Sequence, residues 1–244
     1  MRNRRSAAVQ LLLLAAGALL VYAAAAVAIN RMPASARLES IGPIAAMPTM
    51  PSGAIEVMTW NLGYGGLGAE SEFFADGGKD YLPPSRAIVD KNIAGIVAEL
   101  SKRSPDVILM QETARPSLLT RGADTLGSVA RTLEGRDNAF SADIATRFLP
   151  APLALKNGLF TSVGWGGARR ELHALPREPG FILGLMKRRY HAQIVRLPTD
   201  GDGTAWVLID IHLSAFDEGA DVKEGQPLFR IDPAPYRHLI TVTR

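Results

Sequence analysis

The chain has 244 residues, a formal net charge of +3 and no cysteine. Its 47% hydrophobic and 21% charged residues are typical of a globular protein and exclude a disordered chain. The lack of cysteine excludes a disulfide framework, thiolate metal sites and a cysteine nucleophile. Part of the small charge belongs to arginines at residues 2, 4 and 5, so net charge gives no indication of a polyanionic partner.

The N-terminal segment has the composition of a membrane span. Residues 1–5 are basic and residues 6–29 are almost entirely apolar. About 20 apolar residues cross a bilayer, whereas the apolar part of a signal peptide is typically about 7–15 residues long, so the length favours an uncleaved anchor. Small residues at Ala23–Ala28 leave a cleaved signal peptide as the alternative. We expect the rest of the chain outside the cytoplasm, in the periplasm or extracellular space, either anchored or secreted.

The remainder divides into a linker, one domain and a tail. Residues 30–53 contain four prolines and are predicted to be a linker; residues 54–222 are predicted to form the domain, and residues 223–244 a divergent tail. Apolar patterns predict two helices, at 85–104 and 125–133. They predict six strands, at 55–60, 106–110, 157–163, 169–174, 191–197 and 204–213. One strand–helix–strand unit followed by antiparallel strands predicts an α+β fold, with two sheets packed face to face and helices outside.

Polar residues follow the two strands of the strand–helix–strand unit. The stretch M-T-W-N-L-G-Y-G-G places Asn61 at the end of the first strand, and D-V-I-L-M-Q-E places Glu112 after the second. Parallel strands end at one edge of a sheet, where ligands bind in open α/β sheets, so we expect the two side chains at one rim. Glu112 offers a hard oxygen to Mg²⁺. Taken singly, however, an asparagine before glycine is most often a turn residue and a glutamate after a strand a solvated charge.

A later strand carries two polar residues on an apolar face. In W-V-L-I-D-I-H-L, period two places Asp210 and His212 on one face with Trp206 and Leu208. Burying both without partners would be costly. A mutual hydrogen bond would merely satisfy them; alternatively, Asp210 orients the His212 imidazole, which polarises a phosphoryl oxygen or protonates a leaving group.

Together these stretches, with N-G-L-F-T-S from Asn157, resemble the endonuclease/exonuclease/phosphatase family, the deoxyribonuclease-I-like hydrolases, over roughly residues 55–221. The resemblance implies a four-layer αββα sandwich that hydrolyses phosphoesters with a divalent metal. Glu112 would ligate Mg²⁺ or Mn²⁺, and Asn61 would position the metal-bound water or phosphate. His212 would act as an acid or oxyanion stabiliser, with Asp210, at a position often occupied by asparagine in the family, orienting it.

The resemblance stops after His212. The family has a helix, a G-D-x-N stretch and a final D-H pair there, and none of these follows His212 in this sequence. We therefore expect an incomplete sandwich, as in a truncated gene product, with an open sheet edge and little activity. The second hypothesis is a membrane-anchored remnant or binding protein without catalysis.

The substrate class stays open at this stage. Nucleic acid, a phospholipid headgroup and a small phosphoester all fit, and no protein partner is predicted. Basic residues are frequent between positions 169 and 189 and could face phosphates, although a solvated strand edge is favoured, since basic residues also discourage strand-edge aggregation. They are Arg169, Arg170, Arg177, Lys187, Arg188 and Arg189.

Overall fold

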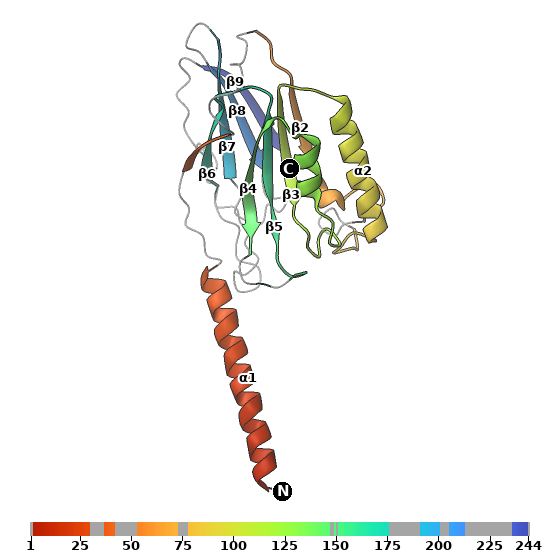
Figure 1. Ribbon diagram of the computed structural model, residues 1–244, viewed down its shortest axis with the longest axis vertical. Coiled ribbons are helices and arrows are strands. Elements are labelled where there is room, and N and C mark those ends of the chain that lie inside the picture. The colour runs from red at the N-terminus through yellow and green to blue at the C-terminus, as the bar shows by residue number, and fades with distance from the viewer. Residues whose placement is uncertain are drawn as a thin grey trace.

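Figure 1 shows the computed structural model of the chain. It describes residues 2–29, 37–41, 53–72, 78–146, 149, 151–175, 191–200, 205–212 and 236–243. For residues 2–6, 27–29, 37–40, 174 and 236–243 it describes the backbone alone.

The elements follow the predicted order, with three additional strands. The helices are α1 (Arg2–Ile29), α2 (Arg86–Lys102) and α3 (Thr125–Thr132), with a short 3₁₀ turn, η1, at Gly63–Gly65. The strands are β1 (Arg37–Ser40), β2 (Val57–Asn61), β3 (Val107–Ala114), β4 (Asp137–Ala145), β5 (Lys156–Val163), β6 (Arg169–Ala174), β7 (His191–Pro198), β8 (Ala205–His212) and β9 (Tyr236–Thr243).

Two sheets pack face to face, as the sequence predicted. One has the order β2-β3-β5-β4 and the other the order β1-β6-β7-β8-β9. The predicted crossover is confirmed, because β2 and β3 are parallel neighbours joined through α2. Between the sheets lies a core that includes Val107 and Leu109 from one sheet and Val195 and Leu208 from the other. The prediction of an α+β sandwich of two sheets with flanking helices is confirmed.

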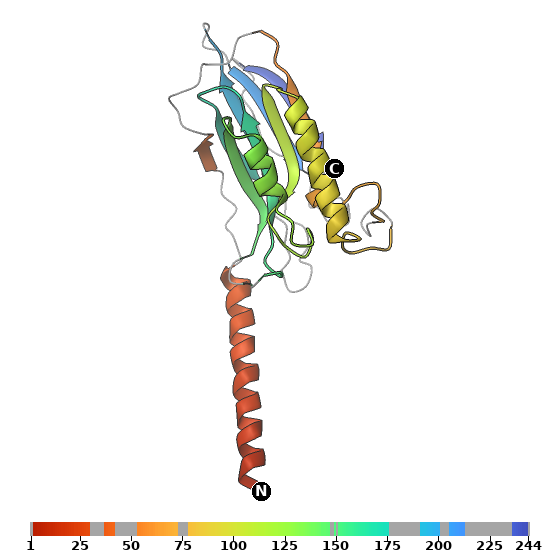
Figure 2. The same ribbon diagram turned by 45° about the vertical axis from the view of Figure 1, so that its right-hand side comes forward.

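The helices α2 and α3 cover the outer face of the four-stranded sheet (Figure 2). Ser85 begins α2 by accepting a hydrogen bond from the Ile88 amide, and Asp124 does the same for α3 through the Gly127 amide. Leu100 and Val129 pack onto Met110 and Phe160 of the sheet. In the part of the chain that the structure describes, no helix lies on the outer face of the five-stranded sheet, so the fourth predicted layer falls outside it.

The strands β1, β4 and β9 were not among the predicted elements. β1 lies inside the predicted linker and pairs with β6, and β9 lies inside the predicted tail and pairs in parallel with β8. The edge of β8 that we expected to be open is therefore occupied by β9. β4 escaped prediction because Asp, Asn and Ala are poor strand formers. β9 did carry a signal, the β-branched run in L-I-T-V-T.

Two bulges interrupt the four-stranded sheet, one on each strand beside β5. The β3–β5 register shifts between Met110 and Thr113, and the β4–β5 register shifts between Ala142 and Ile144. Each bulge contains an acidic residue: Glu112, after Gln111, in the first, and Asp143 in the second. Bulges re-aim side chains and are frequent next to active sites, so these two define where a site should be sought.

Candidate active site

Glu112 is held in an unusual backbone conformation at the end of β3. Its φ is 54°, a left-handed value that a non-glycine residue adopts only at a cost of about 1–3 kcal/mol. Its Oε1 lies 3.3 Å from Nε2 of His212, on the facing sheet. Its Oε2 is buried and has no hydrogen-bond partner among the described residues. The strained backbone therefore holds a buried carboxylate oxygen to which no described residue donates a hydrogen bond.

His212 lies between two carboxylates. Besides Glu112 on Nε2, Asp143 Oδ2 is 3.9 Å from the imidazole Nδ1. Burial alone would lower the imidazole pKa, but the two carboxylates outweigh it and raise the pKa to about 9. A raised pKa favours the imidazolium form, whose N–H groups can deliver a proton or stabilise negative charge on oxygen.

Asp210 is fully buried and hydrogen-bonds across the sandwich. Gln111 Nε2 donates to its Oδ1 over 2.7 Å, while a second, longer contact of 3.4 Å joins Gln111 Nε2 to Thr59 Oγ1. Burial raises the Asp210 pKa to about 7. Asp210 and His212 share a face, as predicted, but the hydrogen bond of Asp210 goes to Gln111. The carboxylates beside the imidazole nitrogens are those of Glu112 and Asp143.

The substitution Asp210→Asn is expected to stabilise the protein at alkaline pH. Because the folded state raises the Asp210 pKa from 3.8 to about 7, this carboxyl contributes stability that is fully present below pH 3.8 and is lost as the pH rises through about 7. Asparagine keeps the acceptor for Gln111 and cannot ionise. In urea unfolding, the variant should exceed the wild type at pH 8, and this difference in the free energy of unfolding should be smaller at pH 5 by about 1–3 kcal/mol. Equal stability of the two proteins at pH 8 would contradict this assignment.

Asn61 lies at the predicted rim and also forms a turn. It pairs in register with Gln111, the residue before Glu112, and its Oδ1 accepts a hydrogen bond of 3.0 Å from the Gly63 amide. The following residues Gly63, Tyr64 and Gly65 have φ values of 51°, 58° and 77°. Thr125 Oγ1 stabilises this left-handed turn by donating a hydrogen bond of 2.8 Å to the Tyr64 carbonyl. The glycine-rich stretch after Asn61 thus reverses the chain beneath α2 and α3.

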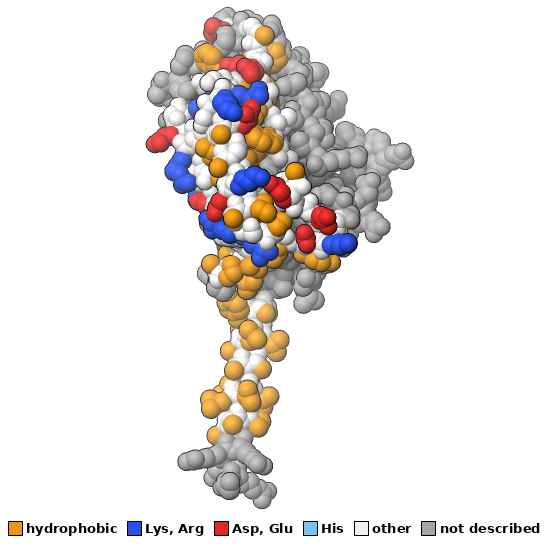
Figure 3. Space-filling view, turned by 90° about the vertical axis from the view of Figure 1, so that its right-hand side faces the viewer, with side chains coloured by type: hydrophobic (Ala, Val, Ile, Leu, Met, Phe, Trp, Pro, Cys, Tyr) orange, Lys and Arg blue, Asp and Glu red, His pale blue; other side chains and the backbone are white. Residues whose placement is uncertain are grey.

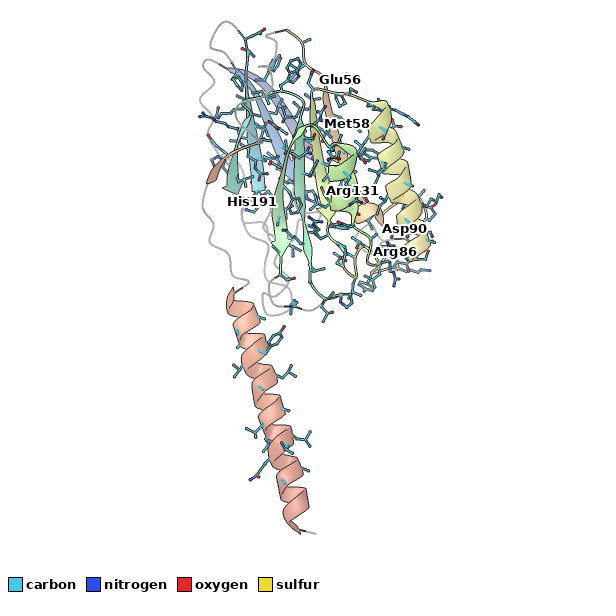
Figure 4. All side chains as sticks on the ribbon, in the orientation of Figure 1. Glu56, Met58, Arg86, Asp90, Arg131 and His191 are labelled. Carbon is cyan, nitrogen blue, oxygen red and sulfur yellow. The ribbon has the colours of Figure 1, made fainter. Side chains whose placement is uncertain are left out.

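Two site residues were missed by the sequence reasoning. Asp143 stands in the β4 bulge, and His191 begins β7, where its Nδ1 is 3.4 Å from Asp143 Oδ1. Figure 4 shows His191 at the end of β7 that points toward α1. Asp143 is thus shared by two histidines, His191 and His212. Nothing in the alternation of residues 137–145 marks Asp143, because the bulge that aims it is a feature of pairing with β5.

Among the described residues, the basic residues of positions 169–189 do not form a surface patch. Arg170 is buried between the sheets, donating 3.1 Å hydrogen bonds to Gln193 Oε1 and to the Phe140 carbonyl. Gln193 in turn donates to Thr161 Oγ1. Residues 177 and 187–189 lie outside the described residues.

The donor chemistry of the site fits a magnesium or manganese ion. The buried Oε2 of Glu112, which has no hydrogen-bond partner in the part of the chain that the structure describes, is a hard ligand of the kind these ions prefer. Mg²⁺ is usually bound through one or two carboxylates, with water and substrate phosphate completing its shell. Among the described residues no three His, Cys, Asp or Glu side chains form a group that could hold a metal ion.

Comparison with known proteins gives structural neighbours only. No family model matches the sequence, and no curated protein does. A solved endonuclease/exonuclease/phosphatase from Beutenbergia cavernae is 19% identical, covering 66% of this chain and 38% of its own at a TM-score of 0.39. Truncated Caenorhabditis elegans TDP2 is 13% identical, with coverages of 67% and 48% and a TM-score of 0.35. ANGEL2, a 2′,3′-cyclic phosphatase, is 12% identical, with coverages of 75% and 45% and a TM-score of 0.31.

The matched part covers less than half of each neighbouring protein's length.

Proposed function

We propose that this chain is a membrane-anchored, exported phosphoester-binding hydrolase whose centre is Glu112, His212 and Asp143. The observation that carries the proposal is the Glu112 carboxylate, held at a strained φ of 54° with Oε1 toward His212 and a buried Oε2 without a partner among the described residues. Strain of this kind concentrates where a side chain is positioned for function. A purely structural glutamate would gain nothing from it.

Each residue of the proposed site has a distinct role. Glu112 would hold Mg²⁺ or Mn²⁺, which supplies charge neutralisation to a phosphate when bound. His212, whose raised pKa favours the imidazolium form, would donate a hydrogen bond or a proton to a phosphoryl or leaving-group oxygen. Asp143 would orient the imidazole from its Nδ1 side. Asn61, at the neighbouring strand end, would contact the phosphate or its water through its amide group.

The anchor is part of the proposal. One helix of the described chain, spanning residues Ala7–Ala26, is long and apolar enough to cross a membrane, and its residues are exposed up to position 25, with Ala26 buried. Figure 1 shows α1 projecting away from the sandwich. The arginines that precede it would remain on the cytoplasmic side. A cleaved signal peptide would give the same domain in a secreted form.

A second candidate is a phosphoester-binding protein without turnover. The observation that favours it is the sequence after His212, which contains no G-D-x-N stretch to supply a water-activating carboxylate. Loss of a general base costs roughly 10²–10⁴-fold in rate. We therefore expect slow hydrolysis by this chain.

Hydrolysis by the full chain, in detergent, should be measured on three substrates: single-stranded nucleic acid, phospholipid vesicles and an aryl phosphodiester. Each is assayed with Mg²⁺, with Mn²⁺ and with excess chelator. The proposal expects metal-dependent product release from one of them, with chelator abolishing it. Saturable, metal-dependent binding without product would establish the second candidate, and the absence of both binding and product would refute the site.

A further inference from the structure

We propose that the end of the sandwich carrying Glu112 and His212 docks onto the surface of the membrane that holds α1, so that the site works on phosphate groups at the lipid–water boundary. This inference rests on the proposed anchor and phosphoester site. We call this end of the molecule the site end: it is where β2, β3, β4 and β8 finish and where β5 and β7 begin.

The chain enters the domain near the site end. In the five-stranded sheet, Arg37 of β1 pairs with Leu172, Leu172 with Gln193, and Gln193 with Asp210. The first residue of β1 therefore lies level with Asp210, two residues from His212. From there β1 runs away from the site end, because Ser40 pairs with Arg169.

The connection from α1 to this entry point is short. Residues 30–36 are all that separates Ile29 from Arg37. A fully extended chain advances at most about 3.3–3.6 Å per residue, so these residues reach no further than about 28 Å. Covalent geometry thus keeps the end of α1 within about 28 Å of Arg37, which lies level with Asp210. Figures 1 and 2 agree that α1 leaves the molecule below the end of β4.

Exposed apolar side chains gather at the site end. Outside α1, the large hydrophobic residues that are exposed in the described chain are Tyr81 (68%), Leu118 (39%) and Leu153 (53%). Tyr81 belongs to the loop after β2, Leu118 to the loop after β3, and Leu153 to the loop between β4 and β5. Single exposed leucines are ordinary, but their restriction to the end that faces α1 is not expected of a freely soluble domain.

Hydrogen bonds join these loops into one surface. The Leu118 amide donates to the Pro152 carbonyl over 3.1 Å, next to Leu153. Arg121 Nε donates over 2.8 Å to the carbonyl of Pro83, two residues from Tyr81. The apolar residues are therefore presented together by bonded loops. Figure 3 shows hydrophobic side chains at the lower margin of the domain, next to α1, with Lys and Arg side chains above them.

The charges around the leucines favour an anionic membrane. Arg121, on the loop of Leu118, and Lys156, the first residue of β5 after the loop of Leu153, are both exposed, and no carboxylate of the described residues forms an ion pair with either. Arg115 is also exposed, although it pairs with Asp124 at 3.1 Å. The loop that carries Tyr81 also carries the acidic residues Glu72 and Asp80. The basic residues therefore lie on the part of the surface around Leu118 and Leu153. A basic residue near an anionic leaflet contributes about 1 kcal/mol of attraction.

The lack of cysteine permits a direct test by single-site labelling. The full chain would be placed in nanodiscs of phosphatidylcholine with phosphatidylglycerol, and Leu118→Cys and Leu153→Cys labelled with a polarity-sensitive fluorophore. Ser104→Cys is the matched control, since Ser104 is exposed at the opposite end, after α2. Lipids with quenchers on their acyl chains should lower the Leu118 and Leu153 signals roughly twofold or more and leave the Ser104 signal unchanged, because docked loops enter only about 5–10 Å.

Further measurements separate the ways in which the inference can fail. Flotation of the chain with vesicles reports the anchor: a chain that does not float overturns both the anchor and the docking. A chain that floats but shows equal quenching at Leu153 and Ser104 overturns the docking alone and leaves the proposed function standing. In a Tyr81→Cys protein, adding Leu118→Glu and Leu153→Glu should abolish quenching at position 81, and persistence of that quenching would also contradict the docked surface.

Discussion

Glu112→Gln is expected to lower metal-dependent phosphoester hydrolysis by roughly 10²–10³-fold, because an ion that stabilises charge on a phosphate supplies several kcal/mol to the transition state. Glutamine keeps the size of the side chain but removes the negative charge that would hold the ion. It also removes the charge partner that lies 3.3 Å from His212. Initial rates with saturating Mg²⁺ or Mn²⁺ measure the effect. An unchanged rate would show that Glu112 takes no part in the reaction.

Glu112→Gly distinguishes loss of the site from loss of the fold. Glycine adopts the φ of 54° without strain, which favours the variant by about 1 kcal/mol or more, while it loses the contact with His212. We expect a melting temperature at or above that of the wild type together with the same loss of activity. A variant that unfolds would show instead that Glu112 is needed for structure.

Gly158→Ala is expected to destabilise the domain by about 3 kcal/mol, at the upper end of overpacking substitutions. A Cβ at Gly158 would lie 2.0 Å from the Ser141 carbonyl oxygen and 2.6 Å from the Asp143 amide nitrogen. Both obstacles are backbone atoms of β4, so β4 must separate from β5 or the bulge must straighten. Either change moves Asp143 away from His212. Urea unfolding measures the stability, and wild-type stability would show that the bulge yields without cost.

A second glycine provides the matched control for the same change. Gly95 lies on the exposed side of α2, and a Cβ there would meet no atom within 4 Å. Because glycine inside a helix is less favourable than alanine, Gly95→Ala should stabilise the protein by about 1 kcal/mol. We expect Gly158→Ala to lower the free energy of unfolding and Gly95→Ala to raise it. This result would show that the loss at Gly158 comes from the close backbone of β4 and not from an added methyl group as such.

The sequence predicted the parts of the site that depend on regular strands. Asn61 and Glu112 follow parallel neighbours, so their positions at one rim follow from the crossover. Asp210 and His212 share a face because side chains alternate along β8. Here local periodicity and the tertiary arrangement agree, and the predicted face was the one that meets the other sheet.

The rest of the site could not be predicted because it depends on pairing between distant segments. Asp143 is aimed by a bulge that exists only against β5, at Gly158. Asp210 was expected to orient His212 because strand alternation places the two side chains on one face. Gln111, from the facing sheet, is nevertheless the residue that donates to Asp210. Which of several nearby polar groups become partners is decided by how the two sheets face each other, and strand periodicity carries no information on that.

The central claim, that Glu112 is the centre of a divalent-metal site, is tested most directly by Mn²⁺ binding. The electron paramagnetic resonance signal of free Mn²⁺ would be followed as the full chain is added, in the presence of inorganic phosphate. Glu99→Gln, which alters a carboxylate on the surface of α2, serves as the control for nonspecific binding. The account predicts one saturable site in the wild type and in Glu99→Gln, and its loss in Glu112→Gln. Equal Mn²⁺ binding by all three proteins, or none by any of them, would contradict it.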